Sequence, residues 1–446
     1  MSLLKASYKQ ILIIALPLII GNLAWTSNGV FDTIFVGKLG NTQLEAIGFA
    51  SVFYSVLFMM GFSFTRGTQL LIARRLGEMN RREVGNILDN TLITLTAVAT
   101  LLFILIRLNL HSILGLMLDS EPVVNACEEF LSYRMWGLVP SFLSFVFIAF
   151  YSGIGQTVIL ALSVGLMTTL NITLNYGLVY GKFGLPEIGI GGSGMATAIS
   201  ETIAVAVLVG GTFYKSRNKE YSLYKFAKFD TDVLMQMIKI SVPLMLQSLA
   251  AVGAWLIFFS RIQVKLGNEP LAVSSIYRQL ILFFTIPTWS LGSAANTIIS
   301  NLVGQRDFEG VKLGIRRISI LSFGFALFSA ALIYLFPYFF INVFVNEAQG
   351  HEVVPMAIEA LPVLFGVFLI MAFGNILYNG VISLGDIFVA LVIELIVVVL
   401  YIGYFMYVLN QPWGNLWWVW TAEWVYWFVM IACSLAYLKY RRIHVV

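Results

Sequence analysis

The sequence predicts an all-α integral membrane protein with twelve transmembrane helices in two pseudo-symmetric six-helix lobes. Of its 446 residues, 59% are hydrophobic and 11% are charged, whereas a soluble domain carries about 25% charged residues. Apolar runs follow one another from Ile11 to Leu438 with short loops between them, and later segments repeat earlier ones. The alternating pattern of barrel strands is absent from the sequence. Such a chain requires a lipid bilayer around it.

Each expected span contains the roughly 20 mostly apolar residues needed to cross a bilayer. The first apolar run is too long for a signal-peptide core and lacks a small-residue cleavage site, so we interpret it as a retained helix. Several runs exceed about 25 residues, which predicts tilt, bending or extension beyond the bilayer. The expected spans are 10–36, 43–72, 88–110, 128–153, 157–180, 192–214, 235–263, 270–302, 317–345, 354–382, 387–409 and 416–438.

The basic residues predict the orientation of these spans. Nineteen of the 27 lysines and arginines lie on the side that carries both termini, whereas the loops on the opposite side hold four. The positive-inside rule therefore predicts a multi-pass protein of the cell (inner) membrane with cytoplasmic N- and C-termini. Six of the ten tryptophans lie between Trp413 and Trp427. They are typical of an interfacial anchor, with a cavity wall as the alternative.

A near-constant spacing relates the two halves of the chain. Pro17 in IALPLII recurs 226 residues later as Pro243 in ISVPLML. Six helices per half make the halves parallel repeats, an arrangement of transporters that bind substrate between two lobes. We expect an N-lobe at 1–214, a C-lobe at 235–446, and between them a cytoplasmic linker at 215–234 that is a solvated tether. Segments separated by 227 residues are 38–41 and 265–268, 76–84 and 303–311, and Tyr151-x-Gly153 and Tyr378-x-Gly380.

Several functional classes lack their sequence signals. The chain has no Walker A, GxSxG or HExxH motif, which argues against ATP-driven transport and against an enzyme. The net charge of +4 reflects membrane topology, so we expect no nucleic-acid partner. No metal site or cofactor is expected, because the cysteines lie far apart and the histidines fall in loops or the tail: Cys127, Cys433, His111, His351 and His444.

Ionisable residues inside the spans are functional candidates, because charge is costly in hydrocarbon. Asp32 is the leading one, in the outer part of the first span and 15 residues after Pro17, a residue that permits a kink. A carboxylate in a poorly hydrated pocket can take up a proton or bind a cation, and the alternative is an acid that reaches the outer interface. The other candidates are Arg66, Arg134, Glu201, Arg261, Arg278, Glu394 and Glu423.

Polar residues of the fifth and sixth spans extend this candidate site. Asn171 and Asn175 share one helix face at i, i+4, and Thr197 follows in the next span. Their oxygens beside Asp32 would suit a proton or a hard cation, or they serve as interhelical contacts. Glu201, four residues after Thr197, belongs either to this network or to a structural pair with an arginine such as Arg66. Arg261, Arg278, Glu394 and Glu423 are expected to form internal ion pairs.

At these residues the sequence resembles the multidrug and toxic compound extrusion (MATE) family. The resemblance rests on LPLIIGN…FDTIFVGKLG at 16–40, on 170–200 and on NLVGQRDFEGV at 301–311, and it extends over essentially the whole chain. It implies secondary antiport, in which amphipathic, often cationic compounds leave against an inward flow of H⁺ or Na⁺. The ion-coupling residues of the family map onto Asp32, Asn171, Asn175 and Thr197. Its kinking proline maps onto Pro17.

The chain departs from subgroups of this family. DinF-like members have a second Asp where this chain has Asn175, and NorM-like members have a Glu where it has Ala251 or Val252. The acidic residue of their tenth helix is also absent from FLIMAFGNILYNG. These differences predict that coupling rests on the N-lobe. A single carboxylate among neutral oxygens favours H⁺ over Na⁺.

The resemblance therefore implies a monomeric efflux antiporter that works by alternating access and carries small organic compounds. The alternative within the same superfamily is a flippase for lipid-linked oligosaccharides. Such a protein moves an anionic head group, so an arginine-lined cavity would be expected, and Arg66, Arg261 and Arg278 keep this reading open. An intramembrane enzyme or a scaffold is the reading from another class.

Overall fold

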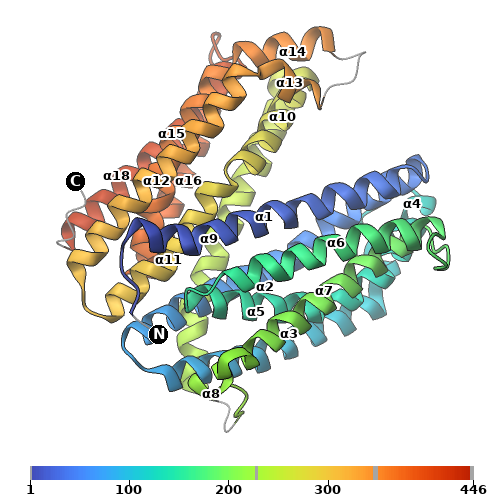
Figure 1. The fold of residues 1–446 in the computed structure, drawn as a ribbon. Coiled ribbons are helices and arrows are strands. Elements are labelled where there is room, and N and C mark those ends of the chain that lie inside the picture. Colours follow the sequence, from blue (N-terminus) through green and yellow to red (C-terminus); the bar gives the residue numbers. More distant parts are fainter. Residues whose placement is uncertain (1–2, 227–229, 345–349, 442–446) are drawn as a thin grey trace. The chain divides into compact units, whose positions relative to one another are not determined.

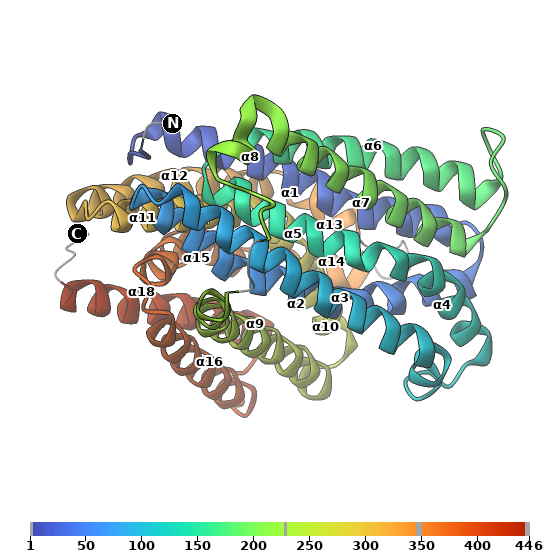
Figure 2. The same cartoon turned by 90° about the horizontal axis from the view of Figure 1, so that it is seen from below.

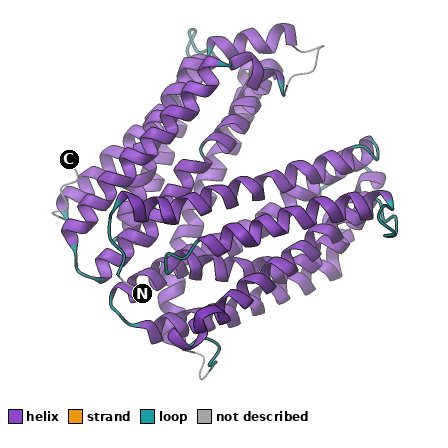
Figure 3. Ribbon diagram, viewed as in Figure 1, coloured by secondary structure: helices purple, strands orange, loops and turns teal. Residues whose placement is uncertain are grey.

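The computed structural model describes residues 3–226, 230–344 and 350–441. Within these ranges all regular structure is helical and no strand occurs (Figure 3). Eleven helices are long and apolar enough to cross a membrane, and a pair bent by 46° forms the twelfth span. The protein therefore has the all-α membrane fold that the sequence predicts.

The chain forms two compact units, and each is described by itself. One comprises Leu16–Ser241 and the other Met1–Ala15 with Val242–Val446. In the first unit α7 packs on α6, α4 and α5, while α2 packs on α5, α4 and α3. These helices run side by side in both views (Figures 1 and 2). Their bounds are α1 Tyr8–Gly37, α2 Asn41–Gly77, α3 Arg81–Gly115, α4 Glu121–Arg134, α5 Leu138–Gly153, α6 Val158–Tyr180, α7 Ile190–Phe213 and α8 Arg217–Glu220.

In the other unit α15 is the central helix, with α12, α18 and α11 packed around it. Prolines explain two of its breaks, because Pro287 lies in the first turn of α11 and Pro337 begins α13. The expected span 270–302 is consequently the bent pair α10 and α11. The bounds are α9 Thr231–Leu266, α10 Asn268–Phe284, α11 Ile286–Gly304, α12 Phe308–Leu335, α13 Pro337–Asn342, α14 Gly350–Glu359, α15 Leu361–Ser383, α16 Ile387–Leu409, α17 Leu416–Trp420 and α18 Ala422–Tyr440.

The chain passes from one unit to the other next to two helix prolines. The changes fall between Ala15 and Leu16 in α1 and between Ser241 and Val242 in α9, just before Pro17 and Pro243. A proline inside a helix cannot donate its backbone hydrogen bond, so the helix is easier to bend there. The expected lobe 1–214 includes the whole first span, whereas in the structure the start of α1 belongs with the second half.

Hydrogen bonds hold the start of the chain in that second-half unit. The backbone N–H of Leu4 donates to Asn301 Oδ1 at 3.3 Å, and Gln305 Nε2 donates to the Leu4 carbonyl at 3.0 Å. Arg317 Nη1 donates to the carbonyl of Ala6 at 2.8 Å. The first turns of α1 are thus attached to α11 and α12.

The linker is a bound strap, and its interpretation as a solvated tether was wrong. The backbone N–H groups of Tyr224 and Lys225 each donate to the carboxylate of Asp89 on α3 at 2.9 Å, and that of Phe226 does so at 3.2 Å. Tyr221 is fully buried. The linker's basic composition suggested full hydration, but its backbone donors have a buried carboxylate as their acceptor.

The tryptophans near the last span serve different roles. Trp420 is fully buried and its indole N–H donates to Ser274 Oγ at 3.0 Å, while Trp424 donates to the carbonyl of Val363 at 2.9 Å. Trp413 and Trp418 are exposed and stack edge to face. An interfacial anchor therefore fits the exposed tryptophans, and Trp420 is part of the core.

Candidate ion-coupling site

Asp32 on α1 lies against polar side chains of α6 and α7. Asn175 Nδ2 donates to Asp32 Oδ1 at 2.6 Å, and the Thr197 hydroxyl lies 3.3 Å from Asp32 Oδ2. Asn171 Nδ2 donates to Thr197 Oγ1 at 2.9 Å, and Asn175 Nδ2 also lies 3.3 Å from Asn171 Oδ1. The two asparagines are fully buried and Asp32 is half-buried. Four of the predicted site residues therefore form one connected network.

Glycines at the start of α7 allow this network to form. A Cβ at Gly192 would lie 2.6 Å from the carbonyl oxygen of Leu178 on α6, and one at Gly194 would overlap the carbonyl oxygen of Phe130 on α4. Without these side chains α7 approaches both helices closely. The close approach brings Thr197 within hydrogen-bonding distance of α6.

Two buried amide oxygens add acceptors to the neighbourhood of the carboxylate. Asn175 Oδ1 is buried without a hydrogen-bond partner, and so is Asn28 Oδ1. Asn28 lies four residues before Asp32 on the same face of α1. The sequence analysis missed Asn28, although its i, i+4 spacing from Asp32 was a usable signal. Carboxylate and amide oxygens together can accept a proton or ligate a hard cation.

Glu201 forms a buried ion pair with Arg134 at the end of α4. Arg134 Nη1 and Nη2 each donate to one carboxylate oxygen at 2.7 Å, and the Ser141 hydroxyl donates to Oε2 at 2.8 Å. The expected arginine partner, Arg66, was therefore the wrong one among the alternatives. Arg134 is the partner because α4 packs directly on α7. The described contacts of Glu201 are separate from the hydrogen bonds of Asp32.

The surroundings of this ion pair come from three further positions. The Arg134 guanidinium lies 3.8 Å from the centre of the Tyr54 ring, and the Tyr54 hydroxyl lies 3.2 Å from Ser141 Oγ. A Cβ at Gly137 would overlap both Arg134 Nη1 and Glu201 Oε2. The pair is thus enclosed by an aromatic face, a hydroxyl and a position that admits glycine.

The second half of the chain does not repeat the polar site. At the spacing of 226 or 227 residues, Asp32 corresponds to Phe258 or Phe259, Asn175 to Ile402 and Thr197 to Trp424. Phe258 packs against the rings of Tyr401, Phe405 and Trp420 at centroid distances of 5.3–5.7 Å. An aromatic cluster therefore occupies the helix that corresponds to α1.

Charged residues expected to form ion pairs in the second half have other described partners. Tyr401 donates to Glu423 Oε1 at 3.1 Å, and Tyr426 donates to Glu394 Oε1 at 2.5 Å. The Arg278 guanidinium lies 5.7 Å from the ring centres of Trp255 and Phe259. Tyrosine hydroxyls and aromatic faces satisfy these groups, which corrects the expectation of ion pairs at Glu423 and Arg278. Within the described residues, no group of three or more His, Cys, Asp and Glu side chains is arranged to hold a metal ion.

Comparisons with known proteins agree with this architecture. The chain is 27% identical over 365 residues to the probable multidrug resistance protein NorM of Agrobacterium fabrum, covering 81% of this chain and 78% of that protein. An outward-facing multidrug resistance MATE family transporter of the MOP superfamily superposes with a TM-score of 0.88 at 19% identity, covering 97% of this chain and 95% of that one. A MOP superfamily transporter from Pyrococcus furiosus gives 0.86 at 19% identity, covering 97% and 95%.

A family-level match accounts for the repeat. The sequence profile of the MatE family matches the chain twice, over residues 17–177 and 243–406. The two matches begin at the two helix prolines, Pro17 and Pro243, and together cover most of the chain. The solved structures agree in fold over nearly its full length. The chain therefore belongs to the MatE family.

Proposed function

We propose that the protein is a secondary active multidrug efflux antiporter that exports amphipathic or cationic organic compounds in exchange for H⁺. Membership of the family and the similarity to relatives named multidrug resistance proteins support this proposal. So does the distribution of basic residues, which favours an inner-membrane protein with cytoplasmic termini. The protein acts as a monomer by alternating access, and it needs no cofactor besides the coupling ion.

The observation that carries the proposal is the setting of Asp32. Within the described structure its hydrogen-bond donors are the neutral side chains of Asn175 and Thr197. The ionised carboxylate accepts both bonds, and these bonds attach α1 to α6 and α7. Protonation removes the negative charge, which weakens charge-assisted hydrogen bonds. Proton uptake at Asp32 therefore loosens α1 from its neighbours.

Pro17 provides the place at which α1 responds. It lies 15 residues before Asp32 in the same helix, about 22 Å along the helix axis. The compact units divide next to it. Bending at Pro17 lets the Asp32 end of α1 move while the N-terminal turns stay bound to Asn301 and Arg317. The kink role predicted for Pro17 is thus a hinge role in this mechanism.

The test uses purified protein in liposomes loaded with a fluorescent organic cation. A proton gradient and a sodium gradient are imposed separately on the wild type, on Asp32→Asn and on the control Asp232→Asn. Asp232 is an exposed carboxylate in the first turn of α9, so the control removes the same charge elsewhere. We expect proton-driven dye movement in the wild type and the control and its loss in Asp32→Asn.

Other outcomes would change the assignment in defined ways. Full proton-driven activity of a folded Asp32→Asn variant would refute the coupling role. Movement under the sodium gradient alone would replace H⁺ by Na⁺ at the same site. No dye movement under either gradient would favour the flippase for lipid-linked oligosaccharides, and a fluorescent lipid-linked sugar would then be the probe.

A further inference from the structure

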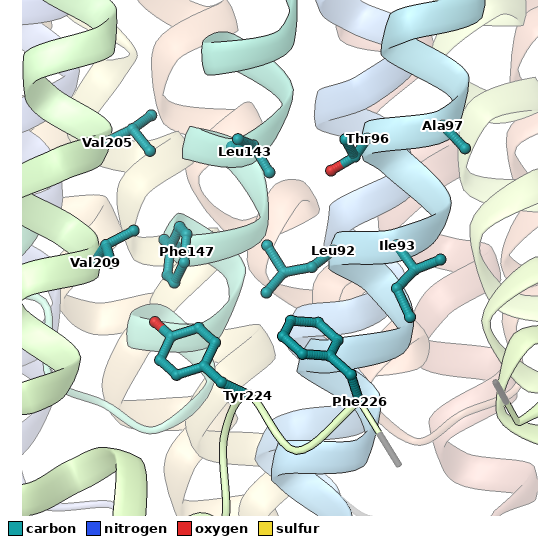
Figure 4. Close-up of a pocket in the computed structure, with 10 residues that line it drawn as sticks. All are labelled: Leu92, Ile93, Thr96, Ala97, Leu143, Phe147, Val205, Val209, Tyr224 and Phe226. Carbon is teal, nitrogen blue, oxygen red and sulfur yellow. The ribbon is translucent and has the colours of Figure 1, made fainter. Parts of the chain in front are cut away.

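An apolar groove lies on the unit Leu16–Ser241, away from the Asp32 network. It has a volume of about 550 Å³ and is formed by α3, α5, α7 and the strap after α8. Figure 4 shows Val205 and Val209 of α7 facing Leu92 of α3, with Leu143 and Phe147 of α5 between them. Every wall of the groove is aliphatic or aromatic except for Thr96 and the Tyr224 hydroxyl.

The rim of this groove is exposed, although its walls belong to membrane-spanning helices. Ile93 is 37% exposed, and Ala97 is also exposed one turn further along α3. The stretch from Leu92 to Ala97 extends about 7.5 Å along the helix axis. An apolar furrow of this kind on a transmembrane helix bundle fits a segment of one hydrocarbon chain.

The strap closes one end of the groove with two aromatic rings. Tyr224 and Phe226 line the groove, and the Tyr224 hydroxyl lies 2.8 Å from Thr212 Oγ1 on α7. Ser222, Tyr224 and Phe226 have positive φ values of 55°, 60° and 42°. Alternating backbone conformations of this kind point successive N–H groups to one side, where an anion binds. Here that anion is the Asp89 carboxylate, so the rings are held in place.

A polar cleft of about 730 Å³ continues from this closed end. It shares Ile93 and Phe226 with the apolar groove, and two basic residues, Arg82 and Lys225, line it. Both are exposed, and none of the ion pairs in the described part of the chain includes either of them. The basic groups of the cleft are therefore available to a ligand.

The acidic residues of the cleft are already engaged. Asp89 accepts the three N–H groups of the strap. Asp230 accepts hydrogen bonds from Asn86 Nδ2 at 3.1 Å and from the backbone N–H groups of Asp232 and Val233. Glu83 accepts a longer bond from Asn86 at 3.5 Å. The charge left for a ligand is consequently positive.

We propose that this continuous surface binds one anionic phospholipid. An acyl chain lies in the groove between α3 and α7, and the phosphate lies in the cleft beside Arg82 and Lys225. Basic pockets at the ends of transmembrane helices recognise acidic head groups in this manner. The bound lipid bridges α3, α7 and the strap. The assignment is independent of the proposed transport activity and of which membrane face carries the strap.

Native mass spectrometry of the purified full chain in detergent tests the site. The probes are phosphatidylglycerol and phosphatidylcholine of equal chain length, each titrated against the wild type and the double variant Arg82→Gln/Lys225→Gln. A basic residue near an anionic lipid contributes about fivefold in affinity, so the double change should weaken phosphatidylglycerol binding about 30-fold. Phosphatidylcholine binding should be weaker in the wild type and unaffected by the change.

Two further variants separate the groove from general charge effects. Arg306→Gln/Lys439→Gln removes two exposed basic residues elsewhere and should leave phosphatidylglycerol binding as in the wild type. Ala97→Phe fills the exposed rim of the groove without altering the core, and it should displace both lipids from the tight site. Gel filtration and melting temperature confirm that each variant is folded.

Four results would overturn the proposal. They are equal binding of the two lipids by the wild type, equal losses in the two double variants, unchanged binding in a folded Ala97→Phe variant, and displacement of phosphatidylglycerol by the organic cation used for transport. The last result would assign the groove to substrate. Displacement by glycerol phosphate alone would make the cleft a free phosphate site and would equally overturn the assignment to a lipid.

Discussion

The buried carboxylate of Asp89 offers a direct test of how the strap is held. The strap contains Ser222, Tyr224 and Phe226 in left-handed conformations, which side chains with a Cβ rarely adopt. Asp89 is 5% exposed and accepts three backbone N–H groups there. Asp89→Asn preserves the shape of the side chain, but it removes the charge and turns one acceptor oxygen into a donor.

The magnitude follows from the opposing contributions. A left-handed residue with a Cβ costs about 1–2 kcal/mol, so three cost about 3–6 kcal/mol. Hydrogen bonds to a charged group contribute about 1.5–3 kcal/mol each, or about 4.5–9 kcal/mol for three. An asparagine retains about half of that contribution at most. We expect the free energy of local opening to fall by about 3 kcal/mol, which corresponds to roughly 100-fold faster amide exchange.

Hydrogen–deuterium exchange of the 222–226 peptide measures this difference. The control is Asp232→Asn, because Asp232 is an exposed carboxylate near the same strap. Its amides should exchange at the wild-type rate, and α15 should be unaffected in both variants. Exchange of 222–226 at the wild-type rate in Asp89→Asn would refute the view that the carboxylate holds the strap. Acceleration throughout the chain would instead indicate global destabilisation.

Two further predictions concern the ion pair and the strap. Glu201→Gln should lower stability by about 3–5 kcal/mol because it leaves the Arg134 guanidinium buried without its counter-ion; the double variant Arg134→Gln/Glu201→Gln should recover part of the loss in melting measurements, and equal stability of the single variant and the wild type would contradict this. The hydrogen bond from Asn86 lowers the pKa of Asp230 below its usual range. Its stabilisation should therefore be complete at pH 7 and lost as pH falls through that lowered pKa, so the first turn of α9 should lose amide protection, corrected for intrinsic rates, at pH 3. Asn86→Ala should reduce the difference, and equal protection at both pH values would exclude this contribution.

The sequence was most informative where a feature repeats along the chain. Apolar length predicted the spans because every helix that crosses a bilayer must meet the same requirement. The bend between α10 and α11 was only a general expectation for long spans, although Pro287 marks its place. The spacing of Asn171 and Asn175 predicted a shared face, and the structure places both beside Asp32. Periodicity therefore served well within one helix.

Partner choice between helices was beyond that reasoning. Arg66 and Arg134 were both plausible partners for Glu201, and the decision depends on how closely α4 approaches α7. Gly194 and Gly137 permit that approach, but single glycines are common in membrane helices and indicate no particular neighbour. Asp89 was missed for another reason. It lies at the edge of an expected span, and its partners are backbone N–H groups, which leave no signal in composition.

The unequal chemistry of the two halves gives α1 a particular place in the proposed mechanism. Each half has a helix with an internal proline at the boundary between units, but only α1 also carries a carboxylate, since the corresponding residue of α9 is Phe258 or Phe259. The N-terminal turns of α1 are bound in one unit by Asn301 and Arg317, and its other end is bound in the other unit through Asp32. A proton at Asp32 weakens the second attachment and leaves the first intact. A single helix thereby links the charge of one carboxylate to both units, which is the physical requirement for coupling an ion gradient to alternating access.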